Sequence, residues 1–388
     1  MGRDGAGKPG ILGAALYVAA ALFLPLARFR PNRILTGDAL PLASLGPGGA
    51  AAAAALAFLA LLFLFLHARR SPWAAPVSAL AALGAVAALA WASRLPHLDG
   101  ETARVSIGAG FFVMLPAALL MLRTAGKRAM RLGTVTVLAF AAGLLLWGAF
   151  ARLSLLREFE ARRETFFAHT ARHLTLALSA AGAAAVLGVL LSFLLLRFRR
   201  LEAPAVFAVN LAQTVPTLSL LGLLLALLVF LGREGGLLGG LGISGVGFLP
   251  AWIALVLYAL YPVLNSALAG LRMADPAALD AARAMGMGAR QAFFRVQLPL
   301  ALPLILGGVR TAVTQSMGNA VLAALIGGGG LGSLIFLGLA QSAADLVLLG
   351  VVPLIALTFA ADAALKYLER ISLRRAGHDP GGIADQNL

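Results

Sequence analysis

Long uninterrupted apolar runs constrain the fold of this 388-residue chain more than any other feature. A helix needs about 20 apolar residues to cross a hydrocarbon layer of roughly 30 Å, and its backbone must be hydrogen-bonded within the segment. We therefore predict an all-α polytopic membrane protein with about ten transmembrane helices. The predicted spans are residues 11–27, 49–66, 73–92, 105–122, 132–151, 173–196, 204–231, 249–271, 298–325 and 346–366.

Composition excludes several other classes. With 61% hydrophobic and 12% charged residues, no soluble domain of ordinary size fits between the runs. The net charge of +15 comes from Lys and Arg in short clusters between spans, which indicates membrane topology and no nucleic-acid partner. The absence of cysteine excludes disulfides and thiol nucleophiles, and the five histidines show no metal-ligand spacing, so no metal site is expected.

The distribution of basic residues predicts the orientation in the cell inner membrane. With the amino terminus inside, most Lys and Arg residues fall on the cytoplasmic side, and both termini are cytoplasmic. The clusters 197–200 and 370–375 directly follow apolar runs and orient the second half, whereas Arg28, Arg30 and Arg33 oppose the first hairpin. Residues 1–27 also fit a secretory signal, which leaves cleavage of the first span open.

A charged interval divides the chain into two modules. Residues 1–151 form a five-helix membrane extension, and residues 152–172 an external polar connector that is either an amphipathic surface helix or a plain loop. Residues 173–368 form the second membrane module, and residues 369–388 a cytoplasmic tail.

The cytoplasmic loop 275–297 differs in composition from the rest and is predicted to be ordered. Asp275 is suited to cap a helix whose first position is Pro276, and Gly286 either ends that helix or allows another backbone to approach. A second amphipathic segment covers residues 289–295, and Pro299 starts the next span. An ordinary solvated loop is the alternative.

The residues of this loop resemble the cytoplasmic signature of ABC importer permeases. That signature is Glu-Ala-Ala, three residues, Gly, nine residues, an aliphatic residue, one residue and Leu-Pro. The spacing is met here by Asp280, Ala281, Ala282, Gly286, Val296, Leu298 and Pro299, with Asp in place of the usual Glu. The resemblance implies a type I importer five-helix core in the second module and docking of the loop on a cytoplasmic ATPase subunit. The small alanines suit a helix that lies deep in a groove on its partner.

Three core segments, beginning at Val209, Leu257 and Ala323, resemble the osmoprotectant branch, whose solutes are glycine betaine, choline and carnitine. This resemblance implies an external solute-binding protein and a second permease copy or a related permease. ATP and Mg would be bound by the partner ATPase, and no cofactor by this chain. The alternative within the class is an importer of amino acids or of another small solute.

Polar residues within spans are candidates for a translocation path. Arg310 lies about 18 Å into its span, near the bilayer midplane, where ionisable groups are by default functional candidates. Helix packing is the alternative for it and for the weaker candidates. The main candidates are Arg310, Asn265, Gln213, Pro216 and Asn319, and weaker ones are Asn210, Thr214, Pro262, Thr314, Gln315 and Ser316.

The glycine run Gly327, Gly328, Gly329 and Gly330 ends the ninth span on the outer side. It is a candidate external gate, and the alternative is a tight turn between helices.

Two rival functions make different demands on the sequence. An ion-coupled secondary transporter normally carries acidic or histidine relays within spans, whereas Asp362 is the only acidic residue well inside a span of the second half. A membrane enzyme would need a catalytic cluster, and no phosphate-binding loop motif is present. We therefore expect a transport subunit that does no bond chemistry.

Overall fold

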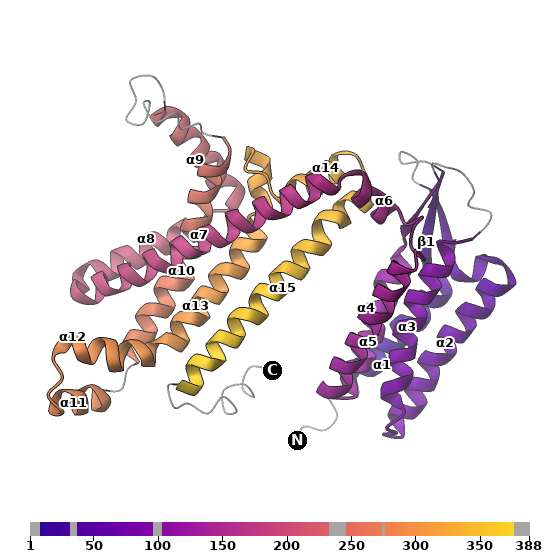
Figure 1. Ribbon diagram of the computed structural model, residues 1–388, viewed down its shortest axis with the longest axis horizontal. Coiled ribbons are helices and arrows are strands. Elements are labelled where there is room, and N and C mark those ends of the chain that lie inside the picture. The colour runs from indigo at the N-terminus through magenta and orange to yellow at the C-terminus, as the bar shows by residue number, and fades with distance from the viewer. Residues whose placement is uncertain (1–7, 32–36, 96–102, 233–245, 274–275, 376–388) are drawn as a thin grey trace. The chain divides into compact units, whose positions relative to one another are not determined.

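The computed structural model describes residues 8–31, 37–95, 103–232, 246–273 and 276–375 (Figure 1). The chain divides into two compact units, Met1–Arg162 and Arg163–Leu388, which are described separately.

The N-terminal unit is a bundle of five longer helices and one short one. They are α1 (Lys8–Phe23), α2 (Gly46–Ala68), α3 (Ala74–Ala92), α4 (Ala109–Thr124), α5 (Lys127–Leu146) and α6 (Ser154–Ala161). The core is rich in alanine, especially along α3, because small side chains let helix backbones approach closely. Tyr17 is fully buried there, and its hydroxyl donates to the Ala81 carbonyl at 2.6 Å.

This unit also contains a three-stranded antiparallel sheet, which the all-α prediction missed. The central strand β1 (Pro25–Arg30) pairs with β2 (Asp38–Pro41) and with β3 (Arg104–Ile107). The strands directly flank apolar helices, so their hydrophobic residues were included in the predicted spans 11–27 and 105–122. The helices themselves end at Phe23 and begin at Ala109.

The C-terminal unit is built on four long helices. The core helices are α7 (Arg163–Arg197), α10 (Phe248–Arg272) and α13 (Leu298–Asn319), and α15 (Ala344–Arg375) packs against α13. Shorter elements complete the unit: η2 (Arg199–Leu201), α8 (Glu202–Thr214), α9 (Thr217–Leu231), α11 (Pro276–Ala284), α12 (Ala289–Ala292), the π-helix η4 (Phe293–Gln297), η5 (Leu322–Ile326) and α14 (Leu331–Ala340). Within this unit, α11 and α12 lie at one end of the long helices and α14 at the other (Figure 1).

Close helix packing in this unit depends on glycine. A Cβ atom at Gly188 of α7 would lie 2.8 Å from the Val263 side chain of α10. A Cβ atom at Gly308 of α13 would lie 2.7 Å from the Pro262 carbonyl oxygen of the same helix α10. Since real Cβ atoms do not approach this closely, glycine sets the spacing between these three helices.

The helical, polytopic fold is confirmed, while the count of ten spans stays a prediction. Among the described residues, seven helices are long and apolar enough to cross a membrane, or eight if the bent pair α8 and α9 is one span. The predicted spans 11–27 and 105–122 correspond to α1 and α4, which have 16 residues each. α7 begins at Arg163, inside the predicted connector 152–172, because the polar residues before its apolar run continue the same helix.

The predicted continuous span 204–231 is broken at Pro216. Helices α8 and α9 meet there at an angle of 105°. Val215 has ψ 127° and Pro216 has ψ 136°, so both residues are extended. Proline disfavours helical backbone at the residue before it, which accounts for the end of α8 at Thr214.

Candidate functional site

The segment between α10 and α13, residues 276–297, is folded throughout, and we call it the linker. Helix α11 ends in a Schellman motif: the Gly286 N–H donates to the Arg283 carbonyl at 2.9 Å and the Met287 N–H to the Ala282 carbonyl at 3.1 Å. Gly286 has φ 81°, a left-handed conformation that glycine adopts without steric cost. The sequence prediction that Gly286 can end this helix agrees with this geometry, whereas its predicted cap, Asp275, lies outside the described residues.

The acidic and alanine positions of the linker face in two directions. Asp280 and Ala281 are exposed, and Asp280 accepts a hydrogen bond from the Arg283 guanidinium at 3.1 Å. Ala282 is only 1% exposed and lies on the side of α11 that packs against α12 and η4. Two large apolar side chains, Met285 and Phe294, are exposed on the linker. The linker therefore presents a mixed apolar and polar outer surface on a folded base.

The linker continues into α13 without a break in helical backbone. Residues 289–319 form one helical rod that includes the π-helical turn η4. Proline at position 299 lacks an N–H and its ring crowds the preceding turn of an α-helix. The wider π turn just before it, in which the Leu298 N–H donates to the Phe293 carbonyl, accommodates that ring. Leu298 and Pro299 thus lie at the point where the linker becomes a span.

Side-chain contacts attach the linker to the packed helices. The Phe293 ring meets the Phe193 ring of α7 edge to face, with centroids 5.1 Å apart. The Gln297 side-chain amide donates to the Leu271 carbonyl at the end of α10 at 2.9 Å. Phe293 and Leu298 also pack on the apolar cluster formed by α10 and α13. A displacement of the linker is therefore transmitted to α7, α10 and α13 together.

A polar cluster lies beside the bend between α8 and α9, and we call it the bend cluster. The Gln213 amide of α8 donates to the Tyr258 carbonyl of α10 at 3.2 Å and to the Gln315 side-chain oxygen of α13 at 3.3 Å. The Tyr258 hydroxyl donates to the Val215 carbonyl. Gln213 and Pro216 were main candidates from the sequence and Gln315 was a weaker one, whereas Tyr258 was not expected to belong to a polar site.

Two of the other predicted path residues lie on the same helix faces as this cluster. Asn265 follows Tyr258 by seven residues, about two turns along α10, and is exposed. Asn319 follows Gln315 by four residues, about one turn along α13. The bend at Pro216, the bend cluster, Asn265 and Asn319 therefore belong to one side of the unit.

Arg310 does not belong to that side. It precedes Asn319 by nine residues, which is about two and a half helical turns, so its side chain lies on the opposite face of α13. Its Nε donates to the Asp362 carboxylate at 2.7 Å and its Nη1 to the Glu369 carboxylate at 3.0 Å, both on α15. Both partners are carboxylates of a neighbouring helix, which is a helix-packing contact. We call these three residues the ion triad.

The glycine run forms a tight turn between η5 and α14. Gly327, Gly329 and Gly330 all have φ between 77° and 89°. The Gly328 carbonyl accepts a hydrogen bond from Arg172 Nε at 3.1 Å, and the turn also packs against His173, the next residue of α7. The irregular backbone is buried at Gly328 and Gly330, whereas Gly327 at the start of the turn is exposed.

The arrangement first defines a class of protein. A broken helix beside a polar cluster, within a bundle of membrane-length helices, is typical of transport subunits. An ordered linker joined to three packed spans adds a surface through which a partner can move them.

Comparisons with known proteins identify the family. Residues 184–371 match the family described as binding-protein-dependent transport system inner membrane component. Residues 7–156 match the family described as the N-terminal domain of the ABC transporter permease YehY. The osmoprotectant import permease protein OsmW of Salmonella typhimurium is 34% identical over 200 residues, 52% of this chain and 88% of that protein. The choline transport system permease protein OpuBB of Bacillus subtilis is 33% identical over 201 residues, 52% of this chain and 85% of that protein.

Among solved structures, an inward-facing crystal form of the MetNI methionine ABC transporter aligns with a TM-score of 0.46 and 19% identity, covering 53% of this chain and 95% of that chain. The chain belongs to the binding-protein-dependent transport system inner membrane components and is a multi-pass membrane permease subunit of an ABC importer.

Proposed function

We propose that this permease imports a small osmoprotectant of the glycine betaine, choline and carnitine class. The proposal is supported by its relatives, which include permeases for osmoprotectants, for choline and for glycine betaine, carnitine and choline. An external binding protein would deliver the solute, and a second permease copy or a related permease would complete the pathway. Both termini would lie on the cytoplasmic side.

The observation that carries the mechanism is the rigid base of the linker. Asp280, Ala281, Met285 and Phe294 would contact the cytoplasmic ATPase subunit, which would bind ATP and Mg. Apolar side chains exposed beside small and acidic residues suit burial in a groove on a partner. Because Phe293 and Gln297 connect the linker to α7 and α10, closure of the ATPase subunits would shift the spans that surround the path.

The path itself would run along the side of the unit that carries the bend cluster. Gln213 and Gln315 are partly exposed within the subunit and supply amide groups at membrane depth. A quaternary ammonium or zwitterionic solute needs dipoles and water along its route more than fixed charge. The bend at Pro216 frees backbone carbonyls, which can interact with such a solute.

A pair of matched glycine substitutions tests the linker. Neither Gly286 nor Gly288 has any atom within 4 Å of an added Cβ, but Gly286 has φ 81° whereas Gly288 has φ −64°. Gly286→Ala would strain the end of α11 by about 1 kcal/mol or more, and Gly288→Ala would not. Gly286→Asn should be milder, because Asn tolerates the left-handed region.

The measurement is uptake of radiolabelled glycine betaine by proteoliposomes that contain the permease, its ATPase and its binding protein, with and without internal ATP. We expect ATP-dependent uptake, reduced several-fold by Gly286→Ala and unchanged by Gly288→Ala. ATPase stimulation by methionine in place of glycine betaine would overturn the solute class while leaving the linker proposal intact. Equal effects of the two alanine substitutions would overturn the linker proposal alone.

A further inference from the structure

Five helix ends of the N-terminal unit meet at one end of the bundle. α1, α3 and α5 begin there, and α2 and α4 end there (Figure 1). A Cβ atom at Gly10 would lie 3.2 Å from Thr124 Cγ2 and 3.3 Å from His67 Nε2, so α1, α2 and α4 are in direct contact. We call this region the basic end, and its Lys and Arg residues are Lys8, Arg69, Arg70, Arg123, Lys127, Arg128 and Arg131.

The positive charge of the basic end has no carboxylate to balance it among the described residues of this unit. The described acidic residues are Asp38, Glu158 and Glu160, on β2 and α6, at the end that carries the sheet. Glu158 is already paired with Arg104 at 2.6 Å. None of the basic-end side chains forms an ion pair within the described ranges of the unit. This face therefore favours an anionic partner from outside the chain.

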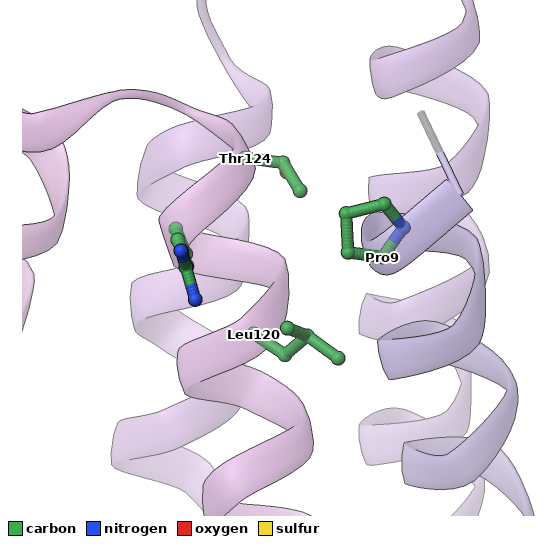
Figure 2. Close-up of a pocket in the computed structure, with 4 residues that line it drawn as sticks. Pro9, Leu120 and Thr124 are labelled. Atoms are coloured by element: carbon green, nitrogen blue, oxygen red, sulfur yellow. The ribbon is translucent and has the colours of Figure 1, made fainter. Parts of the chain in front are cut away.

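A pocket of about 460 Å³ opens at the basic end between α1 and α4. Its lining consists of Pro9 from α1 and Leu120, Arg123 and Thr124 from α4. Figure 2 shows the Pro9 ring facing Leu120 and Thr124 across the gap between the two helices. The pocket thus combines apolar walls with one guanidinium, which is suited to a planar, two-point contact with phosphate oxygens.

The surface beside the pocket is apolar. Leu12 of α1, about one turn after Pro9, is 56% exposed, and Leu16, one turn further on the same face, is also exposed. A ligand whose anionic group contacts Arg123 can therefore lay hydrocarbon along α1. A free inorganic anion would gain nothing from these side chains, whereas the acyl chains of a phospholipid would cover them.

We propose that this pocket binds the headgroup phosphate of an anionic phospholipid. Arg123 makes the principal contact, the other cations of the basic end add long-range attraction, and the exposed face of α1 holds an acyl chain. A zwitterionic headgroup fits less well, because its ammonium group would be repelled by the surrounding Lys and Arg side chains.

The test is native mass spectrometry of the full-length protein in detergent, titrated with phosphatidylglycerol or with phosphatidylcholine of the same acyl chains. We expect bound phosphatidylglycerol to exceed bound phosphatidylcholine. Arg123→Gln should weaken phosphatidylglycerol binding about tenfold, through loss of a charge-assisted contact, whereas Arg123→Lys should retain most of it. The matched control is Arg131→Gln, which removes the same charge from α5 but does not line the pocket, and we expect less than a threefold change.

Three outcomes would overturn the proposal. Equal losses from Arg123→Gln and Arg131→Gln would indicate diffuse surface charge without a site. Equal binding of the two lipids would exclude recognition of an anionic headgroup. Displacement of phosphatidylglycerol by millimolar inorganic phosphate would indicate a free-phosphate site. Size-exclusion chromatography of each variant confirms that a loss of lipid does not reflect misfolding.

Discussion

The ion triad allows a quantitative prediction for Arg310→Gln. The Arg310 guanidinium bonds to Asp362 at 2.7 Å and to Glu369 at 3.0 Å, so one side chain of α13 forms ion pairs with two side chains of α15. The substitution removes both contacts and leaves two carboxylates facing the subunit without a cation. We expect the permease to be less stable and α15 to separate more easily from α13.

The magnitude follows from the exposure of the three side chains. An exposed ion pair contributes about 0 to 1 kcal/mol, whereas removal of one partner of a buried pair costs about 3 to 5 kcal/mol. The triad lies between these limits, since its side chains are 33%, 34% and 25% exposed. We therefore expect Arg310→Gln to lower the free energy of unfolding by about 2 kcal/mol.

A second substitution separates charge from packing. Asp362→Asn in the Arg310→Gln background removes one unpaired carboxylate and should recover about 1 kcal/mol. Asp362→Asn alone should cost less than Arg310→Gln, because Arg310 keeps its bond to Glu369. The assay is unfolding by sodium dodecyl sulfate in mixed micelles, followed by helical circular dichroism.

Uptake measurements on the same variants test the role of the ion triad. If Arg310 only joins α13 to α15, ATP-dependent uptake should recover with stability in the double variant. Wild-type stability of Arg310→Gln would refute the packing argument. Full recovery of stability without recovery of uptake would return Arg310 to the translocation path.

Two further predictions use other contacts of the C-terminal unit. Gly332→Ala should abolish folded expression, because the new Cβ would lie 2.0 Å from the Val321 carbonyl oxygen. Gly222→Ala is the control and should express normally, because no atom lies within 4 Å of its new Cβ. Equal yields of the two variants in a fluorescence-detected chromatography screen would contradict this prediction. Gln213→Leu and Gln315→Leu should each reduce ATP-dependent uptake several-fold. The double variant should be no worse than Gln213→Leu alone, since Gln213→Leu already removes the hydrogen bond between the two amides as well as the bond to Tyr258. Additive losses would show that the two amides act independently.

Local features of this fold were predictable from the sequence. Each of the ten apolar runs contains a helix. A run of about 20 apolar residues can be recognised without knowing its distant contacts, and as a helix it makes its own backbone hydrogen bonds. The helix end at Gly286 was likewise accessible, since a glycine after a short amphipathic helix is a common Schellman position. Pro216 was noted inside the predicted span 204–231, but neither the break there nor its angle of 105° was predicted.

The sheet of the N-terminal unit was not predictable in the same way. β1 and β3 have six and four residues, and their paired residues lie 74 or more positions apart, as Arg30 with Arg104 illustrates. Short strands beside apolar helices carry too little periodicity to be separated from them. Only the paired partner strand distinguishes such a segment from the end of a span.

The partners of Arg310 were also beyond the reach of the sequence, which left both a path role and helix packing open for it. An arginine near the midplane of a span is rightly suspected of function, but its role depends on which groups it meets. Its partners are 52 and 59 positions away, and Glu369 fell in the predicted tail because the apolar run ends before α15 does. Conversely, Gln213 became a stronger candidate for the path only because its amide bonds to Gln315 of another helix. Polarity within a span identifies residues that need partners, and the packing of the helices decides whether those partners are other side chains of the subunit or the solute.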